Sequence, residues 1–311
     1  MHTNLPKVSV ITPALNAKSV IEACILSVAG QTYPNIEHLV IDACSTDGTQ
    51  ELLAGLADRC HHLRWISEDD RGIYDAMNKG IRMAEGEWLY FLGSDDVLKN
   101  CDVLSTIFTR KEVASNDLLY GYNEFGDKNE TFGGEFSLAK LLIQNICHQA
   151  MFYRKELFEK YGYYDESYRS WSDWEMNIRF FANENIAVTY IPVVISKYAT
   201  GGYSDCNRDE KLLNDLPEII KKYITPKHAA AYQELLVQHQ TITWLEQQCR
   251  NRDTEIQRMA SQIADLNQTI ASQIAELHRQ IESQSVELKG IKSSRMWSVL
   301  KKYRKIKKLF S

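Results

Sequence analysis

The sequence predicts an α/β fold with a mostly parallel central sheet covered by helices on both faces, followed by a long α-helical extension. Over the first 125 residues, short apolar segments rich in β-branched residues alternate with amphipathic segments. Continuous apolar strands that alternate with helices are typical of parallel sheets buried on both faces. Further along, the chain has no Pro or Gly between Lys227 and Lys289. Apolar residues there recur at helical spacing, which predicts the extension.

The first half of the chain contains four predicted strands and three predicted helices. The strands are Val8–Thr12, His38–Asp42, His62–Ile66 and Trp88–Leu92, and the helices are Val20–Gly30, Thr46 (as a cap) to Ala57, and Tyr74–Ala84. Ligands of parallel sheets bind at the carboxyl ends of the strands. The candidate binding segments are therefore those that follow the strands: Thr12–Asn16, Asp42–Asp47, Glu68–Asp70 and Gly93–Asp96.

Composition and charge narrow the class of protein. The 311 residues suffice for one large domain with an appendage, and 44% hydrophobic residues suffice for a packed core. The net charge is −5, but the segment from residue 291 onward carries eight basic residues and no acidic ones. The remainder has 28 basic and 41 acidic residues. An acidic body of this kind argues against nucleic acid as a partner.

Cysteine usage and hydropathy predict a cytoplasmic protein. The seven cysteines are scattered without a CxxC pair, which excludes a disulfide framework or a zinc site and fits a reducing compartment. The N-terminus lacks the profile of a signal peptide. No apolar run reaches the roughly 18 residues that span a bilayer. We therefore expect a soluble or peripheral protein that works in the cytosol.

Residues 229–290 are predicted to form a coiled coil. Their apolar residues fall at steps of three and four, apart from one step of seven between Cys249 and Ile256: Ile242, Leu245, Cys249, Ile256, Met259, Ile263, Leu266, Ile270, Ile274, Leu277 and Ile281. The step of four from Leu266 to Ile270 is followed by a second step of four from Ile270 to Ile274. Such a repeat is a stutter, which locally unwinds a supercoil. The narrow apolar stripe favours a homo-oligomer through residues 235–288 over a single helix packed on its own domain.

Residues 291–311 are predicted to form a basic amphipathic tail. Apolar residues recur at helical spacing among the lysines: Met296, Val299, Leu300, Tyr303, Ile306 and Phe310. Trp297 suits a headgroup interface, and each basic residue near an anionic leaflet contributes roughly 1 kcal/mol. This pattern predicts binding to an anionic membrane surface through residues 294–311, at the inner face of the cytoplasmic membrane. A solvated tail is the alternative.

Carboxylates at strand ends are the first candidates for chemistry. Asp95 and Asp96 directly follow an apolar strand and could bind a divalent cation through oxygen. Mn2+ or Mg2+ at this point would bridge substrate phosphates and stabilise a departing diphosphate. Asp42 could accept a hydrogen bond from a base N–H or a ribose hydroxyl. Turn and cap formation is the alternative role for each of these residues.

Several separated segments resemble, in the same order, family 2 glycosyltransferases of the GT-A fold. These segments are Val8–Asn16, Gln31–Glu37 with Leu39–Asp42 and Ser45–Thr49, Glu68–Gly80, and Ala84–Trp88 with Leu92–Asp96. The resemblance covers about residues 5–205. It implies a Rossmann-like GT-A domain over residues 1–225, with a nucleotide-sugar-binding half (1–125) and an acceptor-side half (126–225).

The resemblance also implies roles for residues of the donor site. Thr12, Pro13 and Asn16 match the nucleotide-binding opening, and Asp42 matches the residue that contacts the base. Asp75 and Lys79 match positions that line the nucleotide and diphosphate site, with Asp70 and Ser94 as further candidates. Asp95 and Asp96 match the DXD-like metal region. Because Gly93 stands where the family often has an acidic residue, metal binding would depend on Asp96 first and Asp95 second.

Asp173 is the candidate catalytic base. Inverting transfer needs one carboxylate to take the proton of the acceptor hydroxyl. The segment Ser172–Arg179 resembles the family segment that carries this base, and Asp173 aligns with the catalytic Asp. Ser172 stands where an acidic residue is often found. The alternatives are that Asp173 caps a helix or that Glu175 is the base.

A second acceptor-side segment supplies sugar-binding candidates. Cys147–Ala150 resembles the corresponding family segment, so His148 and Gln149 could bind the donor sugar or the acceptor. Trp171 and Trp174 could form a platform for a sugar ring. Structural roles in the core are the alternative for His148 and for both tryptophans.

The sequence therefore predicts an inverting glycosyltransferase. It would move a sugar from a nucleotide-diphosphate-sugar donor to a hydroxyl of a glycan or lipid-linked glycan acceptor in bacterial surface polysaccharide synthesis (O-antigen, capsule or exopolysaccharide). A sugar-nucleotide pyrophosphorylase would need a Gly-rich basic loop that Val8–Asn16 lacks. A coiled-coil membrane scaffold with a degenerate domain is disfavoured by five carboxylates that occur together: Asp42, Asp75, Asp95, Asp96 and Asp173.

Overall fold

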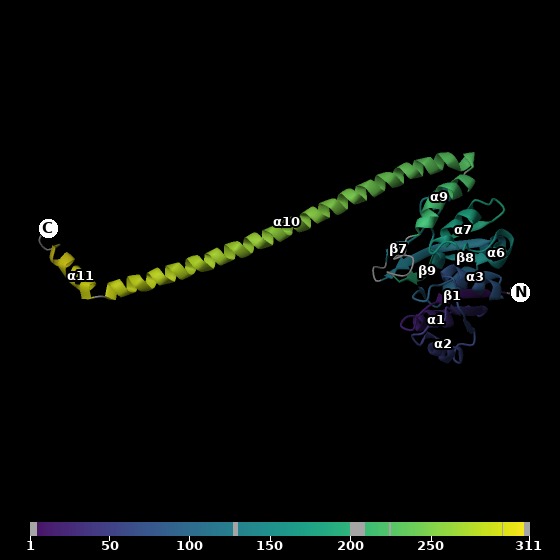
Figure 1. The fold of residues 1–311 in the computed structure, drawn as a ribbon, viewed down its shortest axis with the longest axis horizontal. Helices are drawn as coiled ribbons and strands as arrows, with labels where there is room; N and C mark the ends of the chain where they lie inside the picture. Colours follow the sequence, from purple (N-terminus) through teal and green to yellow (C-terminus); the bar gives the residue numbers. More distant parts are fainter. Residues whose placement is uncertain (1–4, 127–129, 200–208, 224, 294, 308–311) are drawn as a thin grey trace. The chain divides into compact units, whose positions relative to one another are not determined.

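The computed structural model describes residues 5–126, 130–199, 209–223, 225–293 and 295–307 (Figure 1). The chain divides into two compact units, Met1–Gln238 and His239–Ser311. The first unit is an α/β domain and the second is helical. This arrangement confirms the predicted fold class.

The N-terminal half of the first unit is a parallel sheet in the order β3-β2-β1-β4. Its strands are β1 (Val8–Ala14), β2 (Ile36–Asp42), β3 (Leu63–Ser67) and β4 (Trp88–Phe91), and its helices are α1 (Ile21–Ala29), α2 (Thr49–Ala57) and α3 (Ile73–Met83). All seven predicted elements are confirmed. The predicted cap of α2 is wrong: the helix begins after Gly48, whose φ of 94° suits glycine, and not after Thr46.

The second half of the unit extends the same sheet with antiparallel pairings. Its strands are β5 (Val97–Leu98), β6 (Leu118–Phe125), β7 (Glu130–Phe132), β8 (Met151–Arg154) and β9 (Val188–Tyr198). β8 lies antiparallel between β4 and β6, whereas β6 and β9 are parallel. Within the residues that the structure describes, the sheet is therefore parallel in the N-terminal half of the unit and mixed in the second half.

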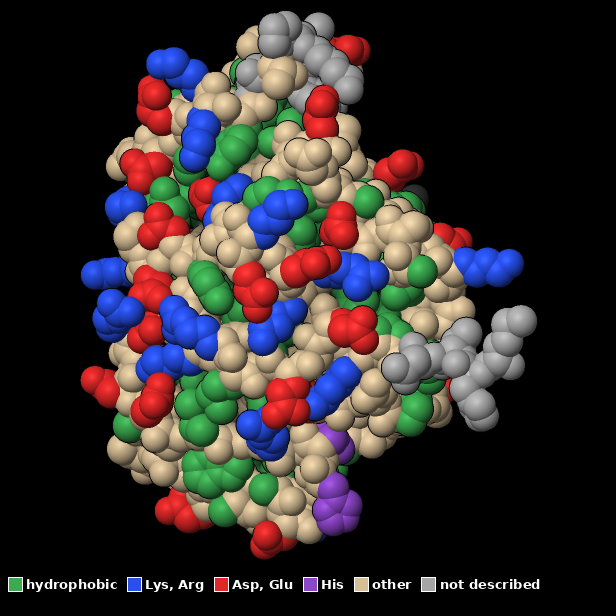
Figure 2. Space-filling model, turned by 90° about the vertical axis from the view of Figure 1, so that its right-hand side faces the viewer, with side chains coloured by type: hydrophobic (Ala, Val, Ile, Leu, Met, Phe, Trp, Pro, Cys, Tyr) green, Lys and Arg blue, Asp and Glu red, His purple; other side chains and the backbone are tan. Residues whose placement is uncertain are grey.

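Helices cover this sheet, and its side chains form one large and one small apolar cluster. The remaining elements of the unit are α4 (Val103–Phe108), η1 (Lys111–Ser115), α5 (Leu138–Leu141), η3 (His148–Ala150), α6 (Lys155–Tyr161), α7 (Ser172–Phe181) and α9 (Glu210–Tyr223). The large cluster includes fully buried Trp88, Phe91 and Phe152. On the surface, basic and acidic side chains are interspersed, as the face drawn in Figure 2 shows. The pair Lys7–Glu85 is one example.

The predicted long helix is confirmed as α10 (Pro226–Ser293), which has 68 residues. At 1.5 Å per residue its length is roughly 100 Å. α11 (Arg295–Lys307) follows it. In α10, the seam side chains from Ile256 to Ile281 are between 49% and 63% exposed. Among the described residues, no helix is long and apolar enough to cross a membrane.

Candidate active site

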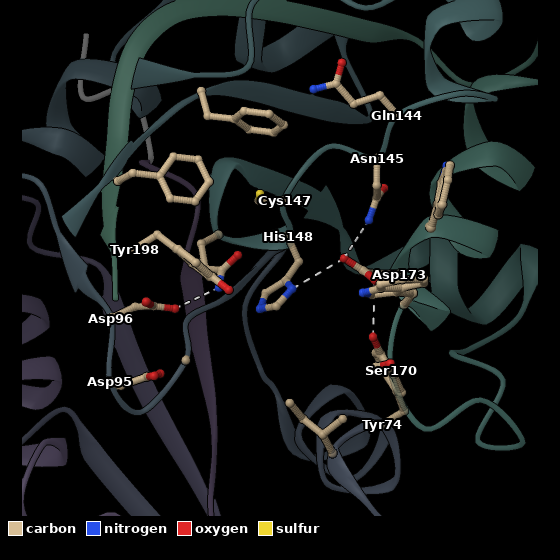
Figure 3. Close-up of a pocket in the computed structure, with 17 residues that line it drawn as sticks. Tyr74, Asp95, Asp96, Gln144, Asn145, Cys147, His148, Ser170, Asp173 and Tyr198 are labelled. Carbon is tan, nitrogen blue, oxygen red and sulfur yellow. Dashed lines mark hydrogen bonds and ion pairs between the residues drawn. The ribbon is translucent and has the colours of Figure 1, made fainter. Parts of the chain in front are cut away.

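A cavity of about 450 Å³ lies beyond the carboxyl end of β4, and Figure 3 shows its lining. The end of β4 and the start of α3 supply one part of the wall, and η3 and the start of α7 supply another. The ends of β6, β7 and β9 close a third side with aromatic rings. The lining residues are Ile73, Tyr74, Gly93, Asp95, Asp96, Phe125, Phe132, Gln144, Asn145, Cys147, His148, Gln149, Ser170, Trp171, Asp173, Trp174 and Tyr198.

Asp173 lies in the first turn of α7, where the helix dipole favours a negative charge. Its side chain does not cap the helix, because α7 begins after Trp171, which has a φ of 65°. The carboxylate accepts a hydrogen bond from Tyr74 Oη at 3.2 Å and one from Asn145 Nδ2 at 3.0 Å. His148 Nδ1 lies 3.5 Å from Asp173 Oδ2 (Figure 3). Asp173 is 5% exposed, so these contacts fix its orientation toward the cavity.

Buried polar groups behind Asn145 fix the direction of its amide. Asn177 Nδ2 donates to Asn145 Oδ1 at 3.0 Å, and Tyr153 Oη donates to Asn177 Oδ1 at 2.9 Å. Because the Asn145 oxygen is occupied in this way, its NH₂ group must face Asp173. Burial raises the pKa of Tyr153 well above its ordinary value, so the hydroxyl stays a donor. The three side chains thus form a directional chain that ends on the candidate base.

Asp95 and Asp96 lie at the opposite side of the cavity, in the turn after β4. Asp96 is 1% exposed and accepts hydrogen bonds from Gln149 Nε2 at 2.7 Å and from the Ala199 N–H at 2.9 Å. Burial raises the pKa of Asp96 to about 6. Asp95 is exposed. A Cβ atom on Gly93 would lie 2.6 Å from Asp96 Oδ2, so the turn has no room for an acidic side chain there.

This pair of carboxylates fits a divalent cation that shares its ligands with a substrate. Carboxylate oxygens are the hard donors that Mg2+ and Mn2+ prefer, and Mg2+ is commonly held by one or two carboxylates plus substrate phosphates. Within the described part of the chain, no group of three or more His, Cys, Asp or Glu residues could hold a metal alone. Asp95 and Asp96 would therefore hold the cation together with a diphosphate.

Other predicted donor-site residues lie outside the cavity lining. Thr12 and Pro13 are buried in β1, and Thr12 Oγ1 lies 2.9 Å from His38 Nε2 in the interior. Asn16 has a φ of 51°, and its amide oxygen accepts a hydrogen bond from the Thr46 N–H at 3.0 Å. The structure therefore gives Asn16 a role in joining the loops after β1 and β2. Ser94 lies partly buried in the turn after β4.

Asp42 is fully buried at the end of β2. Its Oδ2 accepts hydrogen bonds from the Ser45 N–H at 3.0 Å and from Ser67 Oγ at 2.6 Å. Its Oδ1 has no hydrogen-bond partner among the described residues. A buried carboxylate oxygen without a partner is uncommon in folded proteins and marks a position where a ligand donor would fit.

The charged residues around the start of α3 bind mostly one another. Asp75 accepts a hydrogen bond from the Arg71 N–H at 3.0 Å and lies 3.6 Å from Lys79 Nζ. Asp70 accepts from the Gly72 N–H at 2.9 Å. Lys79 also pairs with Glu68 at 3.1 Å. These contacts shape the loop that presents Tyr74 to Asp173.

Of the remaining residues predicted on the acceptor side, four line the cavity and Glu175 does not. His148, Gln149, Trp171 and Trp174 all line the cavity. The two indole rings are 6.4 Å apart in an edge-to-face arrangement, and Trp174 Nε1 donates to the Leu141 carbonyl. Glu175 lies outside the lining and pairs with Arg179 at 3.0 Å. Only Asp173, of the two candidate bases, therefore faces the cavity.

Sequence reasoning missed several residues that line the cavity. Tyr74 is adjacent to Asp75 in a segment that matches the family, so position alone could have indicated it. Asn145 carries no motif and reaches Asp173 only through the packing of α5 and α7. Phe125 and Phe132 lie on the neighbouring strands β6 and β7, whereas Tyr198 ends the distant strand β9. The ring of Phe125 packs against those of Phe132 and Tyr198 at centroid distances of 5.5 and 5.3 Å.

Comparisons with known proteins show which family the chain resembles. The family described as Glycosyl transferase family 2 matches residues 9–162. A Mycobacterium bovis protein named "PGL/p-HBAD biosynthesis glycosyltransferase" is 40% identical over 216 residues, which cover 68% of this chain and 84% of that protein. The "Putative teichuronic acid biosynthesis glycosyltransferase TuaG" of Bacillus subtilis is 41% identical over 96 residues, 30% of this chain and 38% of that protein.

A solved structure shares the fold. The crystal structure of S. aureus TarS 1-349 in complex with UDP-GlcNAc superposes with a TM-score of 0.59 at 20% identity, covering 70% of this chain and 65% of that one. At this identity the likeness concerns the fold. The sequence relatives and the architecture of the cavity together identify the chain as a member of glycosyltransferase family 2.

Proposed function

We propose that this protein transfers a sugar, with inversion, from a nucleotide-diphosphate-sugar donor to a hydroxyl of a glycan or lipid-linked glycan acceptor. The observation that carries the proposal is the position of Asp173. Its carboxylate is 5% exposed and held by Tyr74 and Asn145. It faces a cavity that also contains the Asp95–Asp96 pair. A base and a diphosphate site around one cavity are what a single displacement at an anomeric carbon requires.

The proposed reaction uses Asp173 as general base. The acceptor oxygen attacks the anomeric carbon as Asp173 takes the proton of that hydroxyl. The bond from the anomeric carbon to the diphosphate oxygen breaks, and its electron pair leaves with the nucleoside diphosphate. Tyr74 and Asn145 keep the carboxylate oriented, so little reorganisation is needed during proton transfer. A divalent cation, when bound at Asp95 and Asp96, supplies positive charge for the departing diphosphate.

Asp42 supports a nucleotide in the donor. Its Oδ1 is buried and lacks a partner among the described residues, so an N–H of a nucleobase would satisfy it. The relatives support the acceptor class: one is named for PGL/p-HBAD biosynthesis and another for teichuronic acid biosynthesis. We infer that this chain acts in bacterial surface polysaccharide synthesis.

The proposed reaction is tested with a panel of nucleotide sugars. Wild type, Asp173→Asn and the surface control Asp58→Asn are incubated with uridine, guanosine and thymidine diphosphate sugars, with Mn2+, Mg2+ or EDTA and a set of glycan acceptors. Release of nucleoside diphosphate is measured. We expect turnover in wild type and in Asp58→Asn, loss of at least about 100-fold in Asp173→Asn, and dependence on the cation. Equal rates in all three proteins would refute the role of Asp173.

We also propose that the C-terminal unit brings the enzyme to its acceptor. The seam of α10 would form a homo-oligomer through residues 235–288. The basic tail, residues 294–311, would bind the anionic inner face of the cytoplasmic membrane. In α11, Met296 and Val299 are exposed by 76% and 63%, and Lys301, Lys302 and Arg304 are also exposed. Apolar and basic side chains without cover support this interfacial role.

The membrane proposal is tested by flotation with vesicles. The full chain and a chain that ends at Ser293 are mixed with two kinds of vesicle. One kind is phosphatidylcholine alone, and the other contains about 30% phosphatidylglycerol, because basic segments are attracted to anionic lipid. We expect only the full chain to float, and only with the anionic vesicles. Flotation of the shortened chain to the same extent would show that the tail is not the membrane anchor.

A further inference from the structure

Within the described part of the chain, the apolar side chains of the α10 seam are exposed to solvent from Leu245 onward. The pattern divides at the stutter into two heptad frames. In the heptad notation abcdefg, the a positions are Cys249, Ile256, Ile263, Ile270, Ile274, Ile281 and Leu288. The d positions are Leu245, Arg252, Met259, Leu266, Leu277, Gln284 and Ile291.

We propose that the seam pairs with the same seam of a second copy in a parallel, in-register, two-stranded coiled coil. The inference rests on the oligomer proposed above but not on the catalytic activity. It specifies the number of chains, their direction and their alignment. Four features of the seam favour this arrangement over an antiparallel pair or a larger bundle.

The first feature is the division of side-chain types between the a and d positions. Five of the seven a positions are isoleucine, whereas leucine or methionine fills four of the seven d positions. β-branched residues at a with leucine at d favour two parallel strands, because the two positions pack with different geometry in a parallel dimer. Isoleucine at a d position, which favours larger bundles, occurs only where Ile291 ends the seam.

The second feature is the polar side chain Gln284 at a d position. In a parallel in-register pair, Gln284 faces Gln284 of the second copy, and each amide can donate to the other. In an antiparallel pair that aligns a with d positions, Gln284 would face Ile256 and lose that partner. Polar side chains at core positions select the alignment that satisfies their hydrogen bonds.

The third feature is the charge on residues that flank the seam. In a parallel pair, a g residue lies near the e residue five positions later in the other chain. Glu287 would face Lys292 in this way, and Asp253 of the second copy flanks the layer of Arg252. No pair of like charges arises at the other g and e positions between residues 248 and 285. The antiparallel alignment would bring Glu255 near Glu287.

The fourth feature is the stutter between Ile270 and Ile274. A stutter unwinds the supercoil locally, so both helices of a pair must unwind at the same layer. An in-register parallel pair satisfies this condition at once, because the two stutters coincide. Any shift of register between parallel chains would place a stutter opposite a regular heptad.

Cysteine crosslinking in the full chain tests the proposal. Cys249 occupies an a position, so it should face Cys249 of the second copy. The protein is oxidised with copper–phenanthroline and run on a non-reducing gel. The variants are wild type, Cys249→Ser, and Cys249→Ser combined with either Ile291→Cys (core) or Ser261→Cys (outer face). Light scattering gives the mass before oxidation.

We expect a mass of two chains and covalent dimers through position 249 and through position 291. Cys249→Ser and the outer-face variant should remain largely uncrosslinked. A monomeric or trimeric mass would overturn the two-stranded arrangement. A dimer that forms a disulfide at neither position 249 nor position 291 would overturn the parallel, in-register alignment. No outcome depends on turnover, so failure here is distinct from failure of the proposed transfer reaction.

Discussion

At the scale of single residues, the environment of Asp173 explains how a buried carboxylate can serve as base. Hydrogen bonds from neighbouring side chains fix the orientation of a carboxylate. Tyr74 and Asn145 supply two such bonds, and neither donor carries a charge. These two donors, together with His148 Nδ1 at 3.5 Å, position the carboxylate. A remaining lone pair could take the proton in the proposed transfer.

Replacement of Asn145 by leucine should therefore reduce catalysis more than binding. The change removes one donor to Asp173 and one of the two acceptors of Asn177 Nδ2, which keeps the Ile146 carbonyl at 3.3 Å. We expect kcat to fall about 10- to 100-fold, since the loss of one such contact costs on the order of 1–3 kcal/mol. The KM for the donor should change little. Steady-state kinetics would measure kcat and KM. The control is Gln268→Leu, which lies on the outer face of α10. A rise in KM at constant kcat would contradict a positioning role.

Asp96 should make stability fall with rising pH. Burial raises its pKa to about 6 from an ordinary value of 3.8, so the folded state holds this proton more tightly than the unfolded state. As pH rises from about 4 to 6, the unfolded chain loses the proton first, and folding loses the corresponding free energy. In EDTA, the Tm of Asp96→Asn relative to wild type should rise over this range and then stay constant. A pH-independent difference would contradict the assignment.

At the scale of elements, local pattern predicted the strands that bury apolar residues on both faces. β1, β2 and β4 each contain a short run that is rich in apolar residues, so their sequence alone indicates strands. β6 and β9 contain polar and aromatic residues, and they become strands because they pair with each other. The aromatic side of the cavity depends on these pairings. For that reason Asp95, Asp96 and Asp173 could be predicted, whereas Phe125 and Tyr198 could not.

One carboxylate joins the segment before α7 to the start of α9. Asp209 is 5% exposed and accepts hydrogen bonds from the N–H groups of Arg169, Ser170 and Leu212 at 2.6, 3.0 and 3.0 Å. Burial opposes the ionisation of Asp209, but these backbone donors outweigh it and lower its pKa. Trp171 and Asp173 follow this segment directly, so Asp209 supports the position of the candidate base.

Asp209→Ala should destabilise the first unit by about 2 kcal/mol, because three backbone N–H groups, two of them in the buried residues Ser170 and Leu212, lose a charged acceptor. Because the pKa of Asp209 is lowered in the folded state, the stabilisation is present near neutral pH and is lost as pH falls below about 4. Urea unfolding of both proteins at pH 7 and at pH 3 would measure this. The difference between them should shrink at pH 3; an undiminished difference would point to packing instead.

At the scale of the whole molecule, the two units have different sources of stability. The first has apolar clusters of its own, and partly buried Tyr232 at the beginning of α10 packs against the larger one. The second exposes its apolar side chains along the seam. Helices derive most of their stability from packing of such a face. The proposed coiled coil would supply this packing for the second unit, whereas the first unit has apolar clusters of its own.

A chain that ends at Gln238 should accordingly fold and remain monomeric. It keeps Tyr232 and the whole of α9, so its Tm should lie within about 3 °C of the first transition of the full chain. Its mass by light scattering should be that of one chain. A mass that remains a multiple of one chain would place the oligomer interface in the first unit.

The turn at Gly93 bears on how this enzyme could be altered. The oxygens of Asp96 that a new side chain would meet are held by Gln149 and by the Ala199 N–H. An acidic residue at position 93 would therefore displace Asp96, one of the two carboxylates that are proposed to bind the cation. Glycine at position 93 is therefore compatible with the buried, hydrogen-bonded position of Asp96, whereas an acidic residue there is not. Introducing an acidic residue at position 93 would require coordinated changes in three segments, those that contain Asp96, Gln149 and Ala199. A search for tighter binding of the proposed cation should therefore begin at Ser94.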